Sequence, residues 1–578
     1  MINSELRYSF KSISTGERLL TVFFLTFFLL FLLFGLSLHI GHISILFKIS
    51  SALADSSLIM IPFMLLKGKW RYLYIPLPFI ISLLLAANII YYRNFDDMIQ
   101  PASYFNAALS DPSVIRGATT SAKWYDILYL ILPFLPLSYI ITVKKRVKAF
   151  SIRLSWKLGI LTIFVLSSAI SYAGVFRRIG IYKQLSSLNE IAETVFSKET
   201  STWIGNYEMH NFTGYLVKCA VSRLNIGLEL TPMDLIRIKS HISAAYNNNV
   251  ALHNDSLHAS CKGKNLIMII VESLPYKVIE MKGADKIIPT LTKIVNDSAS
   301  ITSRCRVLAD YGRSSDAQFI YNTGLLPLRN EALADNYAMK DYPSLAKALP
   351  YSSLEVIGES KRLWFHSLTT KSYGFDSLID NVAPSGLNQD SIILDVAKKE
   401  ISKLKSPFYI FITTISMHDP YDSPMVTPAS DTLPVATTDS RDREYLERLH
   451  HFDVNLGRFL SGLESNGILD ESIIVILGDH EIRSSLISQS LHDEYVPFII
   501  MNTPVSLQEP ITTTQLDVFP TIVELLGCRY RYLDVDYSGL GKSIFSPDRI
   551  PGTCHEPTDE DYTVSEMIIK GNPDRIRQ

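Results

Sequence analysis

The stretch at residues 311–318 places two adjacent hydroxyl groups directly after a glycine. Gly312 allows the backbone to turn sharply, and Ser315 with Gln318 three residues later has the spacing of a capping box. We therefore expect Ser314 to lie at or just before the N-terminus of a helix. Free N–H groups and the helix dipole favour a phosphate group there. Taken alone, such a stretch is more often a plain helix cap.

Acidic and imidazole side chains follow three short apolar runs of the sequence. These runs are rich in β-branched residues and cover residues 266–271, 408–415 and 473–477. Glu272 directly follows the first run, and His418 follows the second. Asp479 and His480 come after the third. Such runs suit strands of a parallel sheet that are buried on both faces, and active groups gather at the carboxyl ends of such strands.

Two carboxylates and an imidazole at one sheet edge are a ligand set suited to a divalent metal such as Zn²⁺ or Mn²⁺. The oxygen of Ser314 would supply the fourth position. A hydroxyl bound to a metal loses its proton more easily, so it becomes a nucleophile near neutral pH. Each residue alone would more often be a cap or a surface residue, so the hypothesis depends on the whole set.

Helical stretches at residues 391–404 and 442–466 lie between the apolar runs. Strands that alternate with helices predict an α/β sandwich with a mainly parallel sheet.

The N-terminal part of the chain is expected to lie in a membrane. The chain has 578 residues, of which 47% are hydrophobic, and its mean hydropathy of +0.16 is high for a soluble enzyme. Five apolar runs are each about long enough to cross a bilayer as a helix. They cover residues 19–40, 47–66, 72–92, 125–143 and 158–176.

Basic residues predict the orientation of these runs. They cluster before the first run, between the second and third, and between the fourth and fifth. If all five runs span, these clusters share one side, which the positive-inside rule assigns to the cytoplasm. Everything after about residue 178 then lies outside. Buried core helices of a soluble protein would give no reason for this alternation of charge.

The predicted domain boundaries follow from these patterns. We expect a membrane domain, a helical linker, a catalytic domain and a C-terminal tail at residues 1–178, 179–260, 261–550 and 551–578. Segments 187–196 and 233–245 read as amphipathic helices, which would lie at the membrane surface or simply pack against the protein.

Cysteine usage and net charge exclude some classes of function. All five cysteines follow residue 200 without a CxxC pattern or a zinc-ligand cluster,. One or two disulfides and buried free thiols are both compatible with this spacing. The formal net charge of -2, with no basic aromatic stripe, gives no reason to expect nucleic acid.

The combined pattern resembles the lipoteichoic acid synthase group of the sulfatase-like, alkaline-phosphatase-type superfamily. The resemblance is carried by residues 271–273, 312–316 and 478–480. Its relatives include phosphoglycerol and phosphoethanolamine transferases of bacterial envelopes. The architecture is similar too, because about five N-terminal spans precede a helical linker and an extracytoplasmic catalytic domain in that group.

The resemblance implies roles for the residues that match the pattern. It makes one divalent metal the cofactor, Mn²⁺ or Zn²⁺ first and Mg²⁺ as a further option, and its ligands would be Glu272, Ser314, Asp479 and His480. Ser314 would also be the nucleophile that carries a covalent phosphate. The group commonly has Thr there, so the choice between Ser314 and Ser315 stays open.

The resemblance also implies substrate contacts. His418 resembles the histidine that contacts the substrate phosphate, and His492 is a further candidate. Trp364 and His366 occupy the place of a Trp-x-Arg contact to phosphoglycerol. His in place of Arg weakens a bidentate grip on phosphate. Asp517, in a segment similar to the closing helix of the superfamily, is interpreted as structural.

The implied function is transfer of a phospholipid head group, phosphoglycerol or phosphoethanolamine, onto an envelope glycan or lipid acceptor. The enzyme would lie in the bacterial inner membrane with its catalytic domain outside. A metal-dependent phosphodiesterase that passes the group to water is the alternative. A sulfatase would need a Cys or Ser in a C/S-x-P-x-R context, and Cys305 is followed by Arg306, Val307 and Leu308. A catalytically idle scaffold is a further alternative.

Overall fold

The computed structural model of the chain divides into two compact units, one formed by the described residues up to 217 and one by those from 228 onward. The structure describes residues 14–38, 43–66, 70, 73–95, 98–99, 122–143, 152–182, 207, 210–217, 228–251, 257–329, 331–361, 363–380, 382, 389–418, 440–482, 487–504, 511–550 and 552–571.

The first unit is a bundle of apolar helices. Its helices are α1 (Thr15–Ser37), α2 (Ile45–Leu65), α3 (Leu77–Phe95), η4 (Trp124–Asp126), α5 (Ile127–Ile131), α6 (Phe134–Val143) and α7 (Leu154–Tyr182). Within the described residues, α1, α2 and residues 154–178 of α7 are long and apolar enough to cross a membrane. The helical segments 124–131 and 134–142 would make a fourth span, bent by 41°. Pro133 lies at the bend and cannot continue a helix,.

Each of the five apolar runs expected to span therefore contains helix. The third run forms α3, whose apolar segment at residues 77–93 is shorter than the other candidates. The described part of the chain thus holds three to four candidate spans, and the count of five is approximate.

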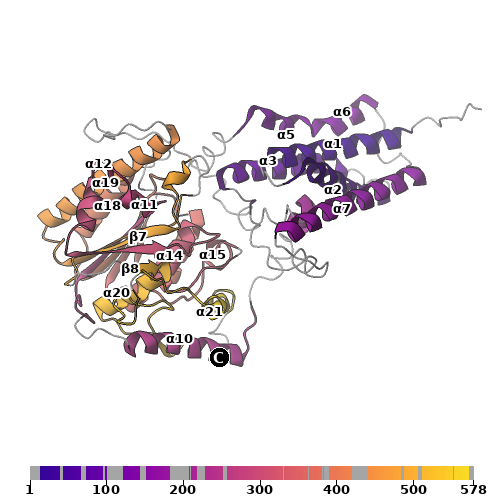
Figure 1. The fold of residues 1–578 in the computed structure, drawn as a ribbon. Coiled ribbons are helices and arrows are strands. Elements are labelled where there is room, and N and C mark those ends of the chain that lie inside the picture. The colour runs from indigo at the N-terminus through magenta and orange to yellow at the C-terminus, as the bar shows by residue number, and fades with distance from the viewer. Residues whose placement is uncertain are drawn as a thin grey trace, which may run out of the picture. The chain divides into compact units, whose positions relative to one another are not determined.

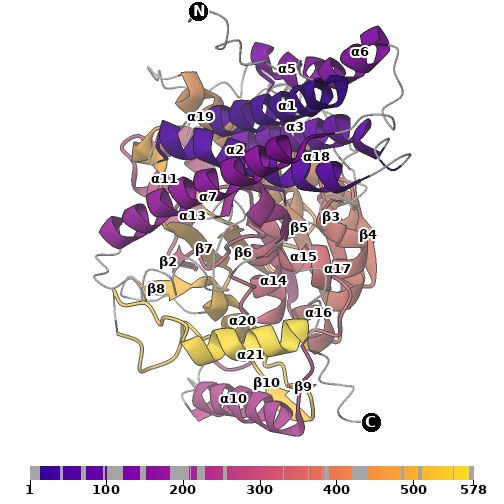
Figure 2. The same cartoon turned by 90° about the vertical axis from the view of Figure 1, so that its right-hand side faces the viewer.

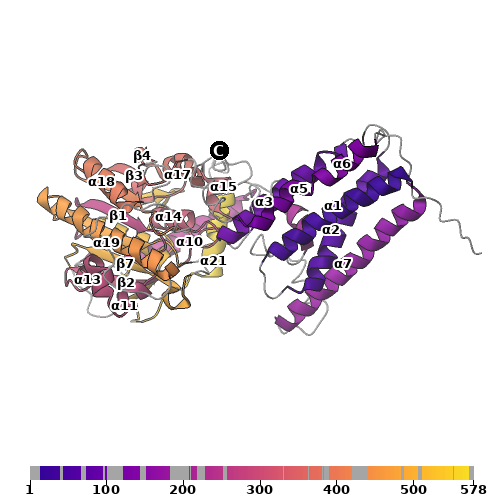
Figure 3. The ribbon, with the colours of Figure 1, turned by 90° about the horizontal axis from the view of Figure 1, so that it is seen from above.

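Two polar contacts fix the directions of the long helices. Arg153, the residue before α7, donates to both carboxylate oxygens of Glu17 in the first turn of α1, with Nη2 2.8 Å from Oε2. Lys48 Nζ, in the first turn of α2, donates to the carbonyl of Leu38 just after α1. Helices α1 and α7 therefore start at the same end of the bundle and run in the same direction, and α2 runs against them (Figure 3).

The second unit is built on an eight-stranded sheet of order β4-β3-β5-β1-β6-β7-β2-β8 (Figure 2). Its strands are β1 (Asn265–Val271), β2 (Ser300–Arg306), β3 (Ser352–Ile357), β4 (Ser377–Ile379), β5 (Phe408–Thr413), β6 (Ser472–Gly478), β7 (Tyr495–Met501) and β8 (Ile511–Thr514). Strand β7 pairs antiparallel with β6 and β2, and the other pairs are parallel. A separate hairpin joins β9 (Tyr530–Tyr532) to β10 (Val535–Tyr537).

Helices cover both faces of this sheet (Figure 1). The helices of this unit are α10 (Pro232–Ala251), α11 (Lys277–Glu280), α12 (Ala284–Ile287), α13 (Pro289–Val295), α14 (Ser314–Thr323), α15 (Leu333–Tyr337), α16 (Leu345–Ala348), η6 (Leu363–Phe365), α17 (His366–Tyr373), α18 (Asp390–Ile401), α19 (Ser440–Ser465), η8 (Gln489–Leu491), η9 (Gln515–Asp517), α20 (Val518–Leu526) and α21 (Asp559–Lys570).

Strand β1 shows why both faces must be covered. Its even-numbered residues Leu266 and Met268 pack in the core that includes α14, α20 and α21. Its odd-numbered residues Ile267 and Ile269 pack in the core that includes α13, α18 and α19. All of them are fully buried, as expected for a strand whose residues alternate between two apolar layers,. The predicted α/β sandwich with a mainly parallel sheet is confirmed.

The structure can be compared with the predicted amphipathic segments and with the cysteines. The amphipathic segment at 233–245 lies within α10, and the one at 187–196 lies outside the described residues. Helix α21 packs on the second unit through Ile568 and Ile569. The four described cysteines are free thiols, two of them buried, and Cys219 lies outside the described residues. The domain boundaries stay a prediction.

Candidate active site

The register of two central strands brings two carboxylates together. Val271 at the end of β1 pairs with Gly478 at the end of β6, so Glu272 and Asp479 leave the sheet side by side. The Asp479 N–H donates to the Val271 carbonyl at 3.1 Å. The Glu272 N–H donates to Thr414 Oγ1, at the end of β5, at 3.0 Å. Both acidic side chains are buried at this sheet edge.

Ser314 is the first residue of α14, as the sequence predicted. The turn before it closes because the Asp316 carboxylate accepts the N–H of Gly312 at 2.8 Å and of Asp310 at 3.2 Å. A Cβ on Gly312 would collide with that carboxylate, so only glycine fits. The expected capping box is wrong, because the Ser315 hydroxyl donates instead to the Gly312 carbonyl at 2.8 Å.

The four residues predicted as metal ligands meet at this edge. Ser314 Oγ donates to Glu272 Oε2 at 3.1 Å and lies 3.2 Å from His480 Nε2. His480 Nε2 lies 3.5 Å from Glu272 Oε1 and 3.5 Å from Asp479 Oδ2. The ligand atoms of Glu272, Asp479 and His480 all lie within 4.8 Å of one another. This spacing allows the three side chains to share one cation.

Hydrogen bonds aim the ligand atoms toward the centre of the cluster. Asp479 Oδ1 accepts the N–H groups of Ser273 and His480, each at 2.7 Å. Its Oδ2 is buried and has no hydrogen-bond partner in the described part of the chain. His480 Nδ1 lies 2.8 Å from the Glu481 carbonyl, to which it donates. That bond leaves the lone pair of His480 Nε2 free to face the other ligands.

The electrostatics of the cluster fit a bound cation. Burial, together with the charge of Asp479, raises the pKa of Glu272 to about 8. Two adjacent buried carboxylates are unfavourable unless a positive charge compensates them. A divalent metal supplies that charge, and a partner for the orphaned Asp479 oxygen. Mixed oxygen and nitrogen ligands are compatible with Zn²⁺ and Mn²⁺.

A network behind the cluster was not predicted from the sequence. Gln515 Nε2 donates to the Asp479 carbonyl at 2.7 Å and to the Tyr321 hydroxyl at 2.8 Å. Its Oε1 accepts the N–H groups of residues 308–309. Tyr321 Oη, on α14, donates to the Gly478 carbonyl at 2.6 Å. Gln515 therefore ties the turn at Asp479 to the helix and loop that carry Ser314, although no local pattern marks it.

Two strained residues adjoin the cluster. Ser273, after Glu272, has φ 48°, and Arg313, before Ser314, has φ 48°. Positive φ costs energy in residues with a side chain, so such residues persist only where surrounding contacts hold them. The Tyr445 hydroxyl on α19 holds Ser273 by donating to its carbonyl at 2.8 Å. Tyr445 is a second supporting residue that the sequence did not mark.

The structure places His418 and His492 in turns outside the four-residue cluster. His418 lies in the turn after β5, and the neighbouring Ser416 is held by Asp390 Oδ1, which accepts its N–H at 3.0 Å. Arg448 on α19 donates to the Ser416 carbonyl at 3.3 Å. His492 follows η8, with Nε2 3.3 Å from the Ile487 carbonyl. Both histidines are partly exposed.

Trp364 and His366 lie on a separate, strained turn. Trp364 and Phe365 have φ 47° and 52°. His366 is only 1% exposed, with Nε2 3.0 Å from Glu359 and Nδ1 3.5 Å from Glu355. Burial alone would lower the pKa of His366, but hydrogen bonds and charges from both glutamates outweigh it and raise the pKa to about 10. His366 is therefore a buried cation, while Trp364 beside it is partly exposed.

Asp517, interpreted as structural, occupies a supporting position. Its carboxylate accepts the N–H groups of Thr514 and Lys542 at 2.9 and 2.8 Å and forms an ion pair with Arg549. These contacts join η9 to the loop after β10.

Two family models match different parts of this chain. The sulfatase model matches residues 264–528, which hold the whole four-residue cluster. The model of the lipoteichoic acid synthase N-terminal domain matches residues 6–189.

Curated relatives span most of the chain. The lipoteichoic acid synthase of Staphylococcus saprophyticus subsp. saprophyticus is 25% identical over 562 residues, covering 92% of this chain and 83% of that protein. Lipoteichoic acid synthase 2 of Bacillus subtilis is 24% identical, covering 81% of this chain and 73% of that protein.

One solved structure shares the fold over both units. The integral membrane protein lipooligosaccharide phosphoethanolamine transferase A from Neisseria meningitidis matches with a TM-score of 0.51 at 13% identity. The match covers 89% of this chain and 95% of that chain.

The Gln515 network generates a prediction about metal affinity. Gln515→Leu removes the donor to the Asp479 carbonyl, so the metal-ligand turn loses its anchor. We expect metal affinity about 10- to 100-fold weaker, as for other residues that orient metal ligands. Isothermal titration calorimetry of chelator-treated full-length protein with Mn²⁺ or Zn²⁺ measures this metal affinity. Gln489→Leu, at an exposed site, is the control, and equal affinities in the two variants would contradict the role.

The raised pKa of Glu272 predicts how pH affects the metal-free protein. The folded state keeps a proton up to about pH 8, whereas an ordinary Glu releases it near 4.5. Because the unfolded chain binds fewer protons in this window, stability falls as pH rises from about 5 to 8. Thermal unfolding of chelator-treated protein should show this decline. The Gln side chain of Glu272→Gln cannot titrate, so the stability of this variant should fall less with pH. Equal falls in the variant and the wild type would refute the raised pKa of Glu272.

Proposed function

We propose that this chain, which is similar to lipoteichoic acid synthases over most of its length, moves a phospholipid head group onto an envelope acceptor. It is a membrane-anchored transferase, and the head group is phosphoglycerol or phosphoethanolamine. The observation that carries this proposal is the position of the Ser314 hydroxyl. It lies at the start of a helix and 3.1 and 3.2 Å from Glu272 and His480.

The cluster is proposed to hold one divalent metal through Glu272, Asp479, His480 and Ser314. Mn²⁺ and Zn²⁺ suit this ligand set, with Mg²⁺ as a further option. When bound, the metal lowers the pKa of the Ser314 hydroxyl and offsets negative charge on the transferring phosphoryl group. The orphaned, buried Asp479 Oδ2 supports this assignment.

In the first half of the reaction, Ser314 is the nucleophile. Its oxygen forms a bond to the phosphorus of the phospholipid while the bond from phosphorus to the diacylglycerol oxygen breaks. The hydrogen bond from Ser314 Oγ to Glu272 Oε2 gives the hydroxyl proton an acceptor. The leaving diacylglycerol oxygen takes a proton from His418 or His492, since an imidazolium can act as a general acid.

In the second half, the head group leaves Ser314. An acceptor hydroxyl on a glycan or lipid forms a bond to phosphorus, and the bond to Ser314 Oγ breaks. The acceptor proton returns to the histidine that lost one in the first half, and the proton held by Glu272 returns to Ser314 Oγ, so the enzyme regains its starting state. Water in place of the acceptor would make the protein a phosphodiesterase.

We propose that His418, His492 and Trp364 contact the head group. All three are partly exposed and lie in turns rather than in the cores. His366 is reassigned from a direct contact to a support. Its ion pairs with Glu355 and Glu359 hold the strained turn that presents Trp364.

The second unit is proposed to lie outside a bacterial cytoplasmic membrane. The Glu17–Arg153 contact supports this, because it makes α1 and α7 start on the same side. The chain therefore leaves α7 on the side opposite to its basic N-terminal residues, whatever the number of spans between. By the positive-inside rule the basic side is cytoplasmic.

The identity of the nucleophile is testable by two matched variants. Ser314→Ala removes the oxygen that attacks phosphorus, so we expect transfer from labelled phospholipid to fall by about a thousandfold or more. Metal affinity should weaken only modestly, because three ligands remain. Ser315→Ala is the control, since its hydroxyl bonds only to the turn at Gly312. Full activity in Ser314→Ala with loss in Ser315→Ala would move the nucleophile to Ser315.

The products of the full-length enzyme separate transfer from hydrolysis. With head-group-labelled phospholipid and a glycan acceptor, we expect label on the acceptor and little free head group. Label released only as free head group would make the enzyme a phosphodiesterase. Mass spectrometry of the trapped Ser314 adduct identifies the head group from the added mass.

A further inference from the structure

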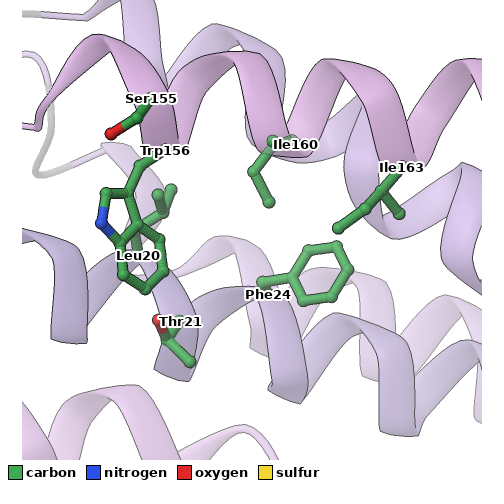
Figure 4. A pocket seen from close by; sticks show the side chains of 8 residues that line it. Leu20, Thr21, Phe24, Ser155, Trp156, Ile160 and Ile163 are labelled. Carbon is green, nitrogen blue, oxygen red and sulfur yellow. The ribbon is translucent and has the colours of Figure 1, made fainter.

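An apolar groove of about 360 Å³ separates α1 from α7 near their N-terminal ends (Figure 4). Leu20 and Phe24 line it from α1, and Trp156 and Ile160 line it from α7. Gly159 leaves it open, because a Cβ there would meet nothing within 4 Å. The volume lies in the range of small-ligand sites, so the groove is large enough to hold part of a molecule.

The surroundings of the groove determine what can fill it. Both helices are candidate membrane spans, and an apolar groove in hydrocarbon offers water no hydrogen-bond partners. Among the described residues that line the groove, only Thr21 and Ser155 carry a hydroxyl, and both lie on the turns near the helix starts. The occupant must therefore be apolar along most of its length, as a lipid acyl chain is.

The end of the groove near the helix starts carries positive charge. Arg18, Arg153 and Lys157 lie there, against the single carboxylate of Glu17. The N-terminal ends of α1 and α7 meet at this end, and both add the positive end of a helix dipole. Trp156 lies beside them, and Trp is typical of the membrane–water interface,. These features favour a lipid head group whose phosphate charge is not balanced by a cation within the same head group.

We propose that this groove binds one anionic phospholipid from the leaflet on the basic side of the bundle. An acyl chain lies along Leu20, Phe24 and Ile160, and the phosphate lies near Arg153 and Lys157. The lipid bridges α1 and α7 at the end where the Glu17–Arg153 pair joins them. This site is distinct from the transfer reaction, which is proposed for the opposite side of the membrane, and it does not depend on that proposal.

The groove itself is tested with two glycine variants on one helix. Delipidated full-length protein in detergent is titrated with phosphatidylglycerol, and native mass spectrometry counts the bound lipids. Gly159→Leu fills the groove and displaces about two methylenes of the chain, so we expect about tenfold weaker binding. Gly174→Leu is the control, because a Cβ there also meets nothing within 4 Å and Gly174 does not line the groove.

The head-group end is tested with a second pair of variants. Lys157→Gln removes a charge beside the phosphate, so we expect roughly fivefold weaker binding of phosphatidylglycerol. Arg177→Gln, an exposed residue near the other end of α7, should leave binding unchanged. Wild-type protein should also bind phosphatidylglycerol more tightly than phosphatidylcholine, which has no net charge. This arm tests the proposal even where Gly159→Leu fails to fold.

Three results would overturn the proposal. If the wild type binds phosphatidylcholine as tightly as phosphatidylglycerol, the groove does not select an anionic head group. Binding of phosphatidylglycerol by Gly159→Leu as tight as by Gly174→Leu would place the lipid elsewhere. A lipid-free dimer of the wild type that Gly159→Leu abolishes would make a second copy of the chain the occupant.

Discussion

The parallel pairing of β1 with β6 is the constraint on which the site depends. Because Val271 is opposite Gly478, Glu272 and Asp479 leave the sheet as neighbours in a buried place. Strand pairing fixes this proximity, so the two charges cannot move apart to lower their repulsion. Burial and repulsion raise the pKa of Glu272, and a divalent cation removes both penalties at once. The sheet therefore builds a buried, acidic site that a divalent cation would stabilise.

The residues around the cluster hold it in a geometry that its own backbone disfavours. Ser273 and Arg313 both have positive φ, and each adjoins a residue whose side chain belongs to the cluster. Tyr445 on α19 holds the turn at Ser273, and Gln515 on η9 holds the turn at Asp479, so both supports come from elements distant in sequence. The ligand positions are thus fixed before any metal binds. Pre-organised ligands spend less binding energy on ordering themselves, so more remains for metal and substrate.

The site residues whose clustering followed from the sequence are those with a local signature. Glu272, Asp479 and His480 follow β-branched runs, and the rule that carboxyl ends of parallel strands meet brought them together. Gln515 and Tyr321 have no such signature, since their hydrogen bond joins residues 194 positions apart. His366 shows what a local pattern leaves out. Its neighbour Trp364 suggested a surface contact, whereas the structure buries His366 between glutamates from β3 and the loop after it.

The resemblance to the lipoteichoic acid synthase group is confirmed. In the membrane unit, the direction of the spans matters more than their exact number. Pro133 breaks one predicted span and α3 is short, so counting hydrophobic runs is sensitive to small differences in sequence. The Glu17–Arg153 contact depends neither on Pro133 nor on the length of α3. It makes α1 and α7 parallel, and two parallel spans require an odd number of crossings from the first through the second. An ion pair at one end of the bundle therefore fixes the relative direction of α1 and α7 without a count of hydrophobic runs.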